Sequence, residues 1–168
     1  MKGPGGGPVQ LQPIPISPWV KRLIILNVGI WFFVQLILER LVFAEPYITQ
    51  FLSFTPKYFL ENFFVWQPFT YMFLHSVNIF HVLLNMVSLW FFGSELEYRW
   101  GAKSFLTYYF VCGVGAAAIY FVAVVAWGLI QGQEPLVYRI PVLGASGAVF
   151  GILLAYGILF GDRVIYLM

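Results

Sequence analysis

Long apolar runs constrain the fold of this chain more than any other feature of its sequence. One run extends from Trp19 to about Phe43, and further runs cover roughly 79–93, 105–130 and 145–160. About 20 consecutive apolar residues in a helix are needed to cross the roughly 30 Å hydrocarbon core of a bilayer. The sequence therefore predicts an all-α, polytopic transmembrane helix bundle with four full spans, followed at Val164 to Met168 by the start of a fifth.

The composition supports a membrane protein. Of the 168 residues, 61% are hydrophobic, 20% are aromatic and 10% are charged, whereas soluble domains usually carry about 25% charged residues. So much apolar surface cannot be covered in water, so we expect an integral, multi-pass protein in a lipid bilayer. The net charge of +2 is too small to suggest a nucleic-acid partner. The single cysteine, Cys112, lies inside an apolar run and cannot form an intrachain disulfide.

The N-terminal residues differ from the rest of the chain. Residues 1–18, MKGPGGGPVQLQPIPISP, are rich in Gly and Pro and lack the apolar core of a signal peptide. We expect a flexible cytoplasmic tail here, although the PIPISP stretch also suits a polyproline II binding segment. A chain of this length suffices for one domain, so residues 19–168 form a single membrane domain.

The segment 44–78, between the first two spans, is too interrupted to be a span itself. It contains three prolines and the charged residues Glu45, Lys57 and Glu61. It is also crowded with aromatic side chains, namely Phe51, Phe54, Tyr58, Phe59, Phe63, Phe64, Trp66 and Phe69. Such a mixture is typical of a loop or of short helices in the membrane interface. Two interpretations stay open, an apolar connector and a lateral lid or packing element.

The basic residues favour a cytoplasmic N-terminus. With that orientation six of the nine Lys and Arg residues lie inside and three lie outside, as the positive-inside rule expects. The six are Lys2, Lys21, Arg22, Arg99, Lys103 and Arg163, and the three are Arg40, Lys57 and Arg139. The second and fourth spans then both start at the outer face and run inward.

Polar side chains gather at these two span starts. The second span opens with His75, His81 and Asn85, and the last two share a helical face because they are four residues apart. The fourth span opens with Ser146. Strongly polar groups within a membrane are costly and usually face a cavity or a partner. We therefore expect a water-accessible site at this depth.

The residue types in this site are suited to acyl transfer. A serine needs a base within hydrogen-bond reach to act as a nucleophile, and the resulting oxyanion needs donors aimed at it. His81 and Asn85 offer side-chain N–H groups, and the backbone N–H of Ser146 is free at a helix N-terminus. Gly144 and Gly147 would let a substrate backbone approach the serine closely.

Other interpretations of these residues remain. Ser146 could bond back to its own helix, and His81 with Asn85 could form an interhelical hydrogen-bonded pair. The two histidines could also bind a metal ion or haem. However, His75 lies in a loop and no Cys or Asp joins the pair, so we expect no metal and no cofactor.

Three motifs, in order along the chain, resemble those of the rhomboid intramembrane serine proteases. The stretch HSVNIFHVLLN at residues 75–85 is similar to the family's two histidines followed by Asn. The stretch GSELEYRWG at 93–101 carries Gly and Glu-x-Arg near the end of the same span, and GASG at 144–147 matches the family's Gly-x-Ser-Gly. The resemblance extends from about residue 19 to residue 168.

The resemblance implies a role for each motif residue. Ser146 would be the nucleophile, His81 and Asn85 would stabilise the oxyanion, and His75 would support the same site. Glu97 and Arg99 would be a structural pair that braces the long first loop, which in this family lies sideways in the lipid. Rhomboids use no metal or cofactor and cleave transmembrane proteins near the membrane surface.

The chain departs from the family pattern in two ways. Five residues separate His75 from His81, where the usual number is four. The family's general base is a histidine on a sixth span, and this sequence stops just after the fourth. We expect the membrane domain to be truncated at its C-terminus and the chain alone to be inactive. The small residues Gly147, Gly151 and Ala155 would mark where the missing helix docks.

The leading hypothesis is thus a rhomboid-type serine endopeptidase. The alternative is a non-catalytic rhomboid-like protein that binds transmembrane helices, although such a protein has no need to keep Ser146, His81 and Asn85 together. We expect the protein in a bacterial inner membrane, because the short N-terminus carries no organelle transit signal.

Overall fold

The computed structural model of the chain describes residues 15–160. Three helices in this range are long and apolar enough to cross a membrane, Pro18–Phe43, Ile79–Trp100 and Ala102–Gln131. The fourth apolar helix, α8, covers Ser146–Phe160 and has 15 residues, which at 1.5 Å per residue gives a length of about 22 Å. The predicted all-α membrane bundle is confirmed, with three full-length spans and a shorter fourth. Val164 to Met168, predicted to start a fifth span, lie outside the described residues.

The long spans are built from several helical segments. The first joins α1 (Pro18–Ile30) to the π-helical segment η1 (Trp31–Phe43), and the second joins α5 (Ile79–Ser88), η3 (Leu89–Gly93) and α6 (Ser94–Trp100). The third is a single helix, α7 (Ala102–Gln131). The connections contain α2 (Tyr47–Leu52), α3 (Pro56–Glu61), α4 (Gln67–Thr70), η2 (Tyr71–Phe73) and η4 (Leu136–Arg139). Pro18 and Pro56 open their helices, where a missing N–H costs no hydrogen bond.

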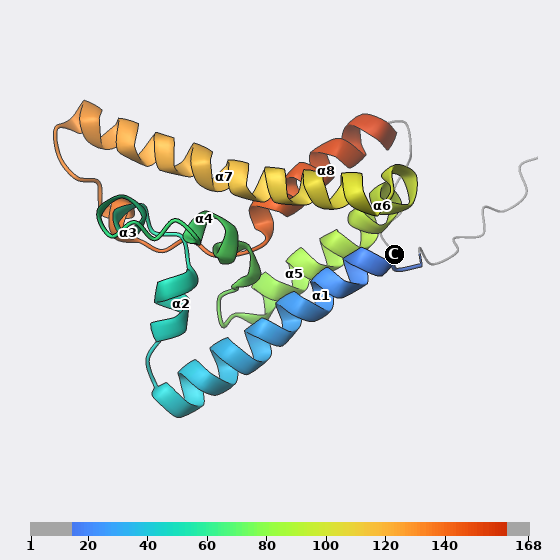
Figure 1. Cartoon of the computed structure of the whole chain (residues 1–168), viewed down its shortest axis with the longest axis horizontal. Helices are drawn as coiled ribbons and strands as arrows, with labels where there is room; N and C mark the ends of the chain where they lie inside the picture. Colours follow the sequence, from blue (N-terminus) through green and yellow to red (C-terminus); the bar gives the residue numbers. More distant parts are fainter. Residues whose placement is uncertain (1–14, 161–168) are drawn as a thin grey trace, which may run out of the picture.

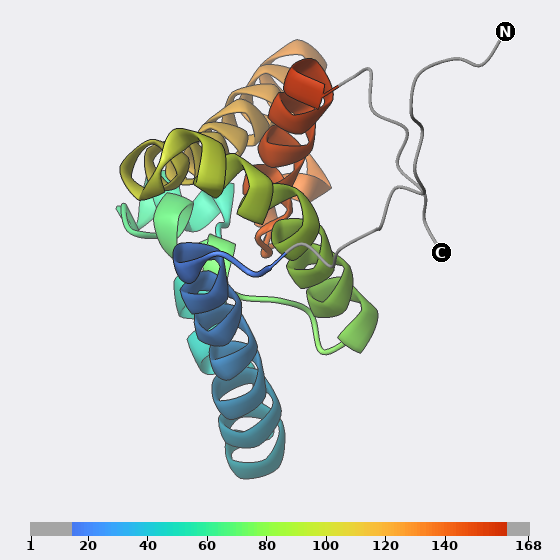
Figure 2. The same ribbon diagram turned by 90° about the vertical axis from the view of Figure 1, so that its right-hand side faces the viewer.

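The helices α5 and α8 start close together and point the same way. Both begin near the centre of the molecule and run toward the end at which α1 starts, whereas α7 runs in the opposite direction (Figure 1). The helix α6 lies across that end of the bundle (Figure 2). The sequence-based expectation that the second and fourth spans start at one depth and run in parallel matches this arrangement.

The segment 44–78 forms short helices that pack against the protein. Phe54 is buried and pairs with Val142 in an isolated antiparallel bridge, with N···O distances of 2.9 and 2.8 Å. The Gln67 side chain accepts a hydrogen bond from the backbone N–H of Thr55 at 3.1 Å. Of the two interpretations left open by the sequence, the packing element is the one that the structure supports.

Glu97 fastens the start of α1 to α6. Its carboxylate accepts hydrogen bonds from the Ser17 hydroxyl and from the backbone N–H groups of Trp19 and Val20, the latter two at 3.1 and 3.0 Å. A carboxylate is favourable there because the first N–H groups of a helix lack partners and carry a partial positive charge. The sequence-based assignment of Glu97 to the first loop was therefore wrong about its partner. Arg99 lies over the Phe160 ring, 5.3 Å from its centroid, rather than beside Glu97.

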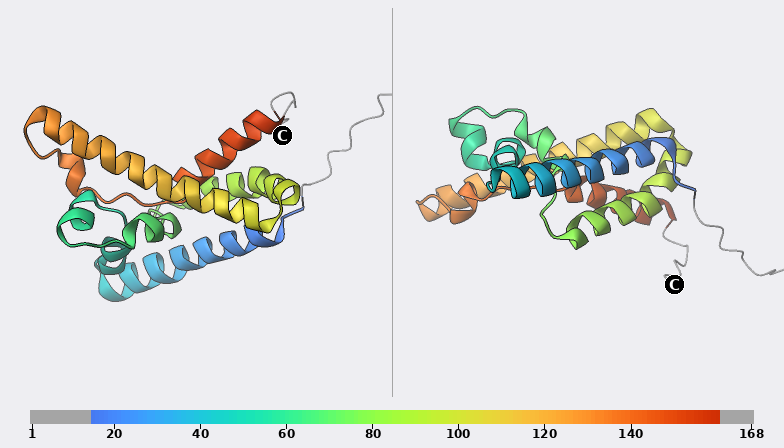
Figure 3. Two further views of the ribbon diagram at one scale, coloured as in Figure 1. Left: turned by 45° about the horizontal axis from the view of Figure 1, so that its top comes forward. Right: turned by 90° about the horizontal axis from the view of Figure 1, so that it is seen from below.

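Small residues let α8 approach α7 closely. A Cβ atom on Gly147 would lie 2.6 Å from the Ala116 Cβ, and one on Gly151 would lie 2.4 Å from the Cys112 Sγ. The two helices meet where α8 begins beside the middle of α7 (Figure 3). Tight helix packing at this stripe was expected, but its assignment to a missing helix was wrong, because α7 already occupies the face of Gly147 and Gly151.

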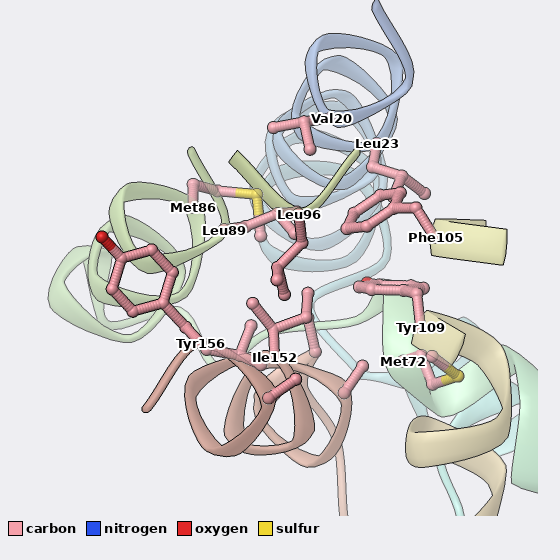
Figure 4. Packing of buried hydrophobic residues seen from close by; sticks show 14 of the residues in the cluster. Val20, Leu23, Met72, Met86, Leu89, Leu96, Phe105, Tyr109, Ile152 and Tyr156 are labelled. Carbon is pink, nitrogen blue, oxygen red and sulfur yellow. The ribbon is translucent and has the colours of Figure 1, made fainter. Parts of the chain in front are cut away.

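The apolar core lies between the spans. Leu96 from α6 and Ile152 from α8 meet at its centre, and side chains from α1, α5 and α7 surround them (Figure 4). The core thus holds α8 in place beside the second span, so the start of α8 has a fixed position relative to the 75–81 turn.

Candidate active site

Ser146 is the first residue of α8 and follows a turn that only glycine adopts easily. Gly144 has φ = +126°, a conformation that L side chains rarely take. Its N–H donates to the carbonyl oxygen of Tyr71 at 2.9 Å. A Cβ on Gly144 would lie 2.9 Å from His81 Nε2 and 3.6 Å from Ser146 Oγ. Gly144 therefore leaves the space in which the histidine and the serine hydroxyl come together.

Gly147 allows close helix packing, whereas the sequence suggested that it leaves room for a substrate backbone. Its bare side faces the Ala116 Cβ, and the Tyr71 hydroxyl would be 3.0 Å from an added Cβ. The space beside Gly147 is thus filled by the protein and is not left for a substrate backbone. Helix packing is the physical reason for this glycine.

The hydrogen bonds of His81 indicate a proton on Nε2, the ring nitrogen next to Gly144. Its Nδ1 accepts a hydrogen bond from the backbone N–H of Ser76 at 3.2 Å, and the Ser76 hydroxyl lies 3.0 Å from the same atom. A neutral imidazole carries one proton, so a ring that accepts at Nδ1 is protonated at Nε2. The Nε2–H group then acts as a donor in the space beside Gly144 and Ser146.

His75 is fully buried and joins the second span to the start of α8. Its Nε2 lies 3.4 Å from the backbone N of Ala145, which donates to it. The centroids of the two imidazole rings are 5.3 Å apart, and the ring planes are inclined at 65° to each other. Burial and, to a smaller extent, the neighbouring His81 lower the pKa of His75 to about 4, against a smaller opposite effect of the Phe73 backbone. His75 is therefore neutral near neutral pH and supports the site despite its unusual spacing.

Asn85 shares the face of His81 but uses one N–H on its own helix. Its Nδ2 donates to the carbonyl oxygen of His81 at 2.7 Å. An amide nitrogen has two N–H groups, so the second is available to an oxyanion. Asn85 is buried on α5, which keeps this amide fixed beside the histidine.

Neither histidine is arranged to take a proton from the serine. The unprotonated nitrogen of His75 already accepts the Ala145 N–H, and the unprotonated nitrogen of His81 already accepts the Ser76 N–H. The Ser146 hydroxyl has no hydrogen-bond partner within the part of the chain that the structure describes. Within residues 15–160, a serine hydroxyl and N–H donors thus lie close together, and both histidines already use their unprotonated nitrogens inside the fold.

The described residues show no metal-ligand cluster. Between residues 15 and 160, no group of three or more His, Cys, Asp or Glu side chains lies close enough to hold an ion. His75 and His81 are the only histidines in the chain. Within residues 15–160, His75 and His81 are therefore not joined by a third side chain that could bind a metal ion.

The sequence analysis missed three residues that shape the site. Tyr71 holds Gly144 through its carbonyl oxygen, and its hydroxyl donates to the Gly113 carbonyl oxygen at 2.6 Å. Trp31 and Gln35 of the first span bond the backbone at Ser76 and His75. The signal for Gln35 was present, because an amide inside an apolar span needs a partner. Tyr71 gave no signal in a segment crowded with aromatic residues.

Comparison with known proteins places these motifs in one family. The family profile described as Rhomboid domain matches residues 62–167. RHOMBOID-like protein 1 of Arabidopsis thaliana is 36% identical over 90 residues, which is 53% of this chain and 19% of that protein. RHOMBOID-like protein 12, mitochondrial, of the same plant is 35% identical over 83 residues, 46% of this chain and 25% of that protein.

A third relative comes from a protozoan. Rhomboid-like protease 3 of Toxoplasma gondii is 28% identical over 102 residues, 60% of this chain and 38% of that protein. The matches thus span about a fifth to two fifths of the length of these relatives. All three relatives come from eukaryotes, so they do not indicate the bacterial inner membrane that the sequence analysis expected.

Proposed function

The chain belongs to the rhomboid family, and on that premise we propose that it provides the nucleophile of an intramembrane serine endopeptidase. The observation that supports this most is the convergence of Ser146 Oγ and His81 Nε2 on Gly144. The start of α8 places the hydroxyl, and the turn before α5 fixes the donor. The substrates are transmembrane proteins, cleaved near the membrane surface.

The reaction divides hydrolysis into two acyl transfers. Ser146 Oγ attacks the substrate carbonyl carbon as its proton passes to a base, and the leaving amine takes up that proton when the C–N bond breaks. Water then attacks the acyl-serine ester, which releases the carboxylate and restores the hydroxyl. The developing oxyanion accepts hydrogen bonds from His81 Nε2–H, from the second Asn85 N–H and from the backbone N–H of Ser146.

The base in this proposal is a histidine from outside this chain, whose two histidines are His75 and His81. Both histidines of this chain already use their unprotonated nitrogens within the fold. The family resemblance places the base on a later span that would approach Ser146. Without it the described bundle binds a carbonyl group but activates its serine poorly.

Covalent labelling tests the proposal. The full gene product, in detergent or in lipid, is treated with a fluorescent fluorophosphonate, which reacts with activated serines. We expect labelling that is lost in Ser146→Ala and kept in Ser88→Ala, a serine further along the second span. A full gene product that never labels, or that labels equally in Ser146→Ala, would contradict the protease assignment.

A non-catalytic role is the second candidate, favoured by the lack of a placed base within residues 15–160. In that case the same bundle binds transmembrane helices without cleaving them. The labelling experiment separates the two, because a folded protein that binds transmembrane helices but never labels would be a scaffold. The protein is an integral membrane protein in either case, and the cytoplasmic location of its N-terminus stays a prediction.

A further inference from the structure

The first span carries a buried polar stripe that lies outside all three family motifs. Trp31, Gln35 and Glu39 recur every four residues, and their exposed fractions are 8%, 4% and 5%. A polar group inside a membrane-spanning helix is expensive unless it has a partner. Each of these three side chains has a hydrogen-bond partner, and each partner lies in the segment 44–78.

Gln35 binds both backbone groups of one catalytic-site histidine. Its Oε1 accepts from the N–H of His75 at 2.9 Å, and its Nε2 donates to the carbonyl oxygen of the same residue. These two hydrogen bonds fix the backbone of His75, as the paired bonds from a neighbouring β-strand would. Since the His75 ring accepts from Ala145, the contact extends from the first span to the residue before the nucleophile.

Trp31 binds the next residue along. Its indole Nε1–H donates to the carbonyl oxygen of Ser76 at 2.9 Å. The N–H of that same Ser76 donates to His81 Nδ1. The orientation of the Ser76 peptide groups therefore determines which nitrogen of His81 keeps its proton.

Glu39 anchors the stripe at its far end. It accepts from the backbone N–H and from the hydroxyl of Thr49 in α2. The Thr49 hydroxyl also lies 3.4 Å from Gln35 Nε2. Glu39 thus holds the neighbouring loop helix against the span, which keeps Gln35 aligned with His75.

We propose that Trp31 and Gln35 are positioning residues that hold the 75–76 backbone so that His81 presents an Nε2–H to the space beside Ser146. They touch no reacting atom and act through Ser76, His75 and His81. The inference rests on the proposed function in one respect: that function supplies the oxyanion that the Nε2–H group would stabilise.

The small number of histidines makes a direct test possible. This chain contains two histidines, so ¹⁵N-histidine labelling in lipid nanodiscs gives two sets of ring nitrogen signals from it, apart from any further histidine of the full gene product. The His81→Gln variant assigns them. Above neutral pH we expect the His81 signals to show a protonated Nε2 and an unprotonated Nδ1.

Two variants and a matched control then separate positioning from general stability. Trp31→Phe keeps a buried ring and removes one N–H, and Gln35→Leu removes both bonds to His75. We expect each to shift the His81 Nδ1 signal toward the protonated form, because the ring loses its fixed donor at Ser76. The control is Asn27→Leu, one turn earlier on the same stripe, whose buried amide donates to Leu23 of its own helix. It should leave the His81 signals unchanged.

Three outcomes would overturn the inference. One is a His81 ring protonated at Nδ1 in the unmodified chain. Another is an unchanged His81 spectrum in folded Trp31→Phe, the milder variant that tests the idea even if Gln35→Leu does not fold. The third is an equal shift in Asn27→Leu.

The tautomer measurement needs neither substrate nor serine reactivity. The expected shifts in a protein whose serine never labels would support the positioning geometry and contradict only the protease function. Labelling of Ser146 with unchanged tautomers in both variants would contradict only the positioning inference.

Discussion

The first span and α7 are both long apolar helices, yet they hold their neighbours by different means. The first span uses buried hydrogen bonds from Trp31 and Gln35 to a loop. The helix α7 uses small side chains, with Ala116 and Cys112 against the bare faces of Gly147 and Gly151. In membranes both close packing and interhelical hydrogen bonds can drive association.

The comparison indicates that the two kinds of contact position different residues of the site. Close packing against α7 sets where α8, and with it Ser146, begins. Hydrogen bonds from the first span set how the backbone before α5 is oriented, and with it His81. The site lies where these two kinds of contact meet, so each can be disturbed separately.

The largest effect is expected from filling the α7–α8 contact. In Gly151→Leu the new Cβ would lie 2.4 Å from Cys112 Sγ and 2.6 Å from its Cβ. Overpacking of this kind destabilises a core by about 3 kcal/mol or more when the backbone has to move. Thermal unfolding in detergent measures the loss. Gly157→Leu is the control, because nothing lies within 4 Å of an added Cβ there, and an equal loss in the control would show that α7 does not press on Gly151.

The second effect is a pH dependence from buried His75. Its pKa of about 4 in the folded state lies below the ordinary 6.5, so the unfolded chain binds more protons between these values. The free energy of unfolding should therefore be highest above pH 6.5 and fall by about 2 to 3 kcal/mol as the pH drops through the folded pKa. Denaturation at a series of pH values checks this. His75→Gln should remove this part of the slope, and an identical slope in the variant would contradict the assignment.

A smaller loss is expected when the start of the first span is released. Glu97→Gln removes the charge that accepts from Ser17, Trp19 and Val20. Hydrogen bonds to charged groups contribute about 1.5 to 3 kcal/mol, and because the amide keeps one acceptor we expect a loss near the lower value. The control is Glu61→Gln, whose exposed ion pair with Lys57 has an N···O distance of 3.8 Å. Comparable denaturation midpoints for the two variants would mean that Glu97 does not hold α1.

The smallest effect is expected from the loss of one hydrogen bond between Tyr71, in the segment before α5, and the helix α7. Tyr71→Phe removes the hydroxyl that donates to the Gly113 carbonyl oxygen in α7 at 2.6 Å. One neutral hydrogen bond contributes about 1 kcal/mol, so we expect a loss of that size in the free energy of unfolding. The exposed Tyr47→Phe should have no measurable effect. A Tyr71→Phe protein as stable as its parent would show that the bond adds nothing to the packing of α7.

Much of the fold could be predicted from the sequence because membrane spans are defined by length and polarity alone. The runs that begin at Trp19, Ile79, Phe105 and Ala145 all became helices, although the second continues seven residues past its expected end, to Trp100. His81 and Asn85 share a face because a helix turn is a local property. The closeness of Ser146 to His81 followed from the shared direction of two spans.

The partners of individual residues could not be predicted in the same way. A stripe of small residues shows that some helix packs there, but not which one, so Gly147 and Gly151 were assigned to the wrong neighbour. Glu97 was expected at the first loop, although a carboxylate satisfies any helix start that comes within reach. The need of Gln35 for a partner could be read from an amide inside an apolar span, but the partner itself could not, because it is a backbone and has no signature in the sequence.

The central claim is that Ser146 is a nucleophile held beside an oxyanion donor. The most direct test is cleavage of a transmembrane reporter by the full gene product in liposomes, with the cut bond located by mass spectrometry. We predict one cut within or next to the membrane-spanning segment, lost in Ser146→Ala and strongly slowed in His81→Phe. Cleavage that continues in Ser146→Ala, or a folded gene product that cuts none of a panel of reporters, would contradict the account.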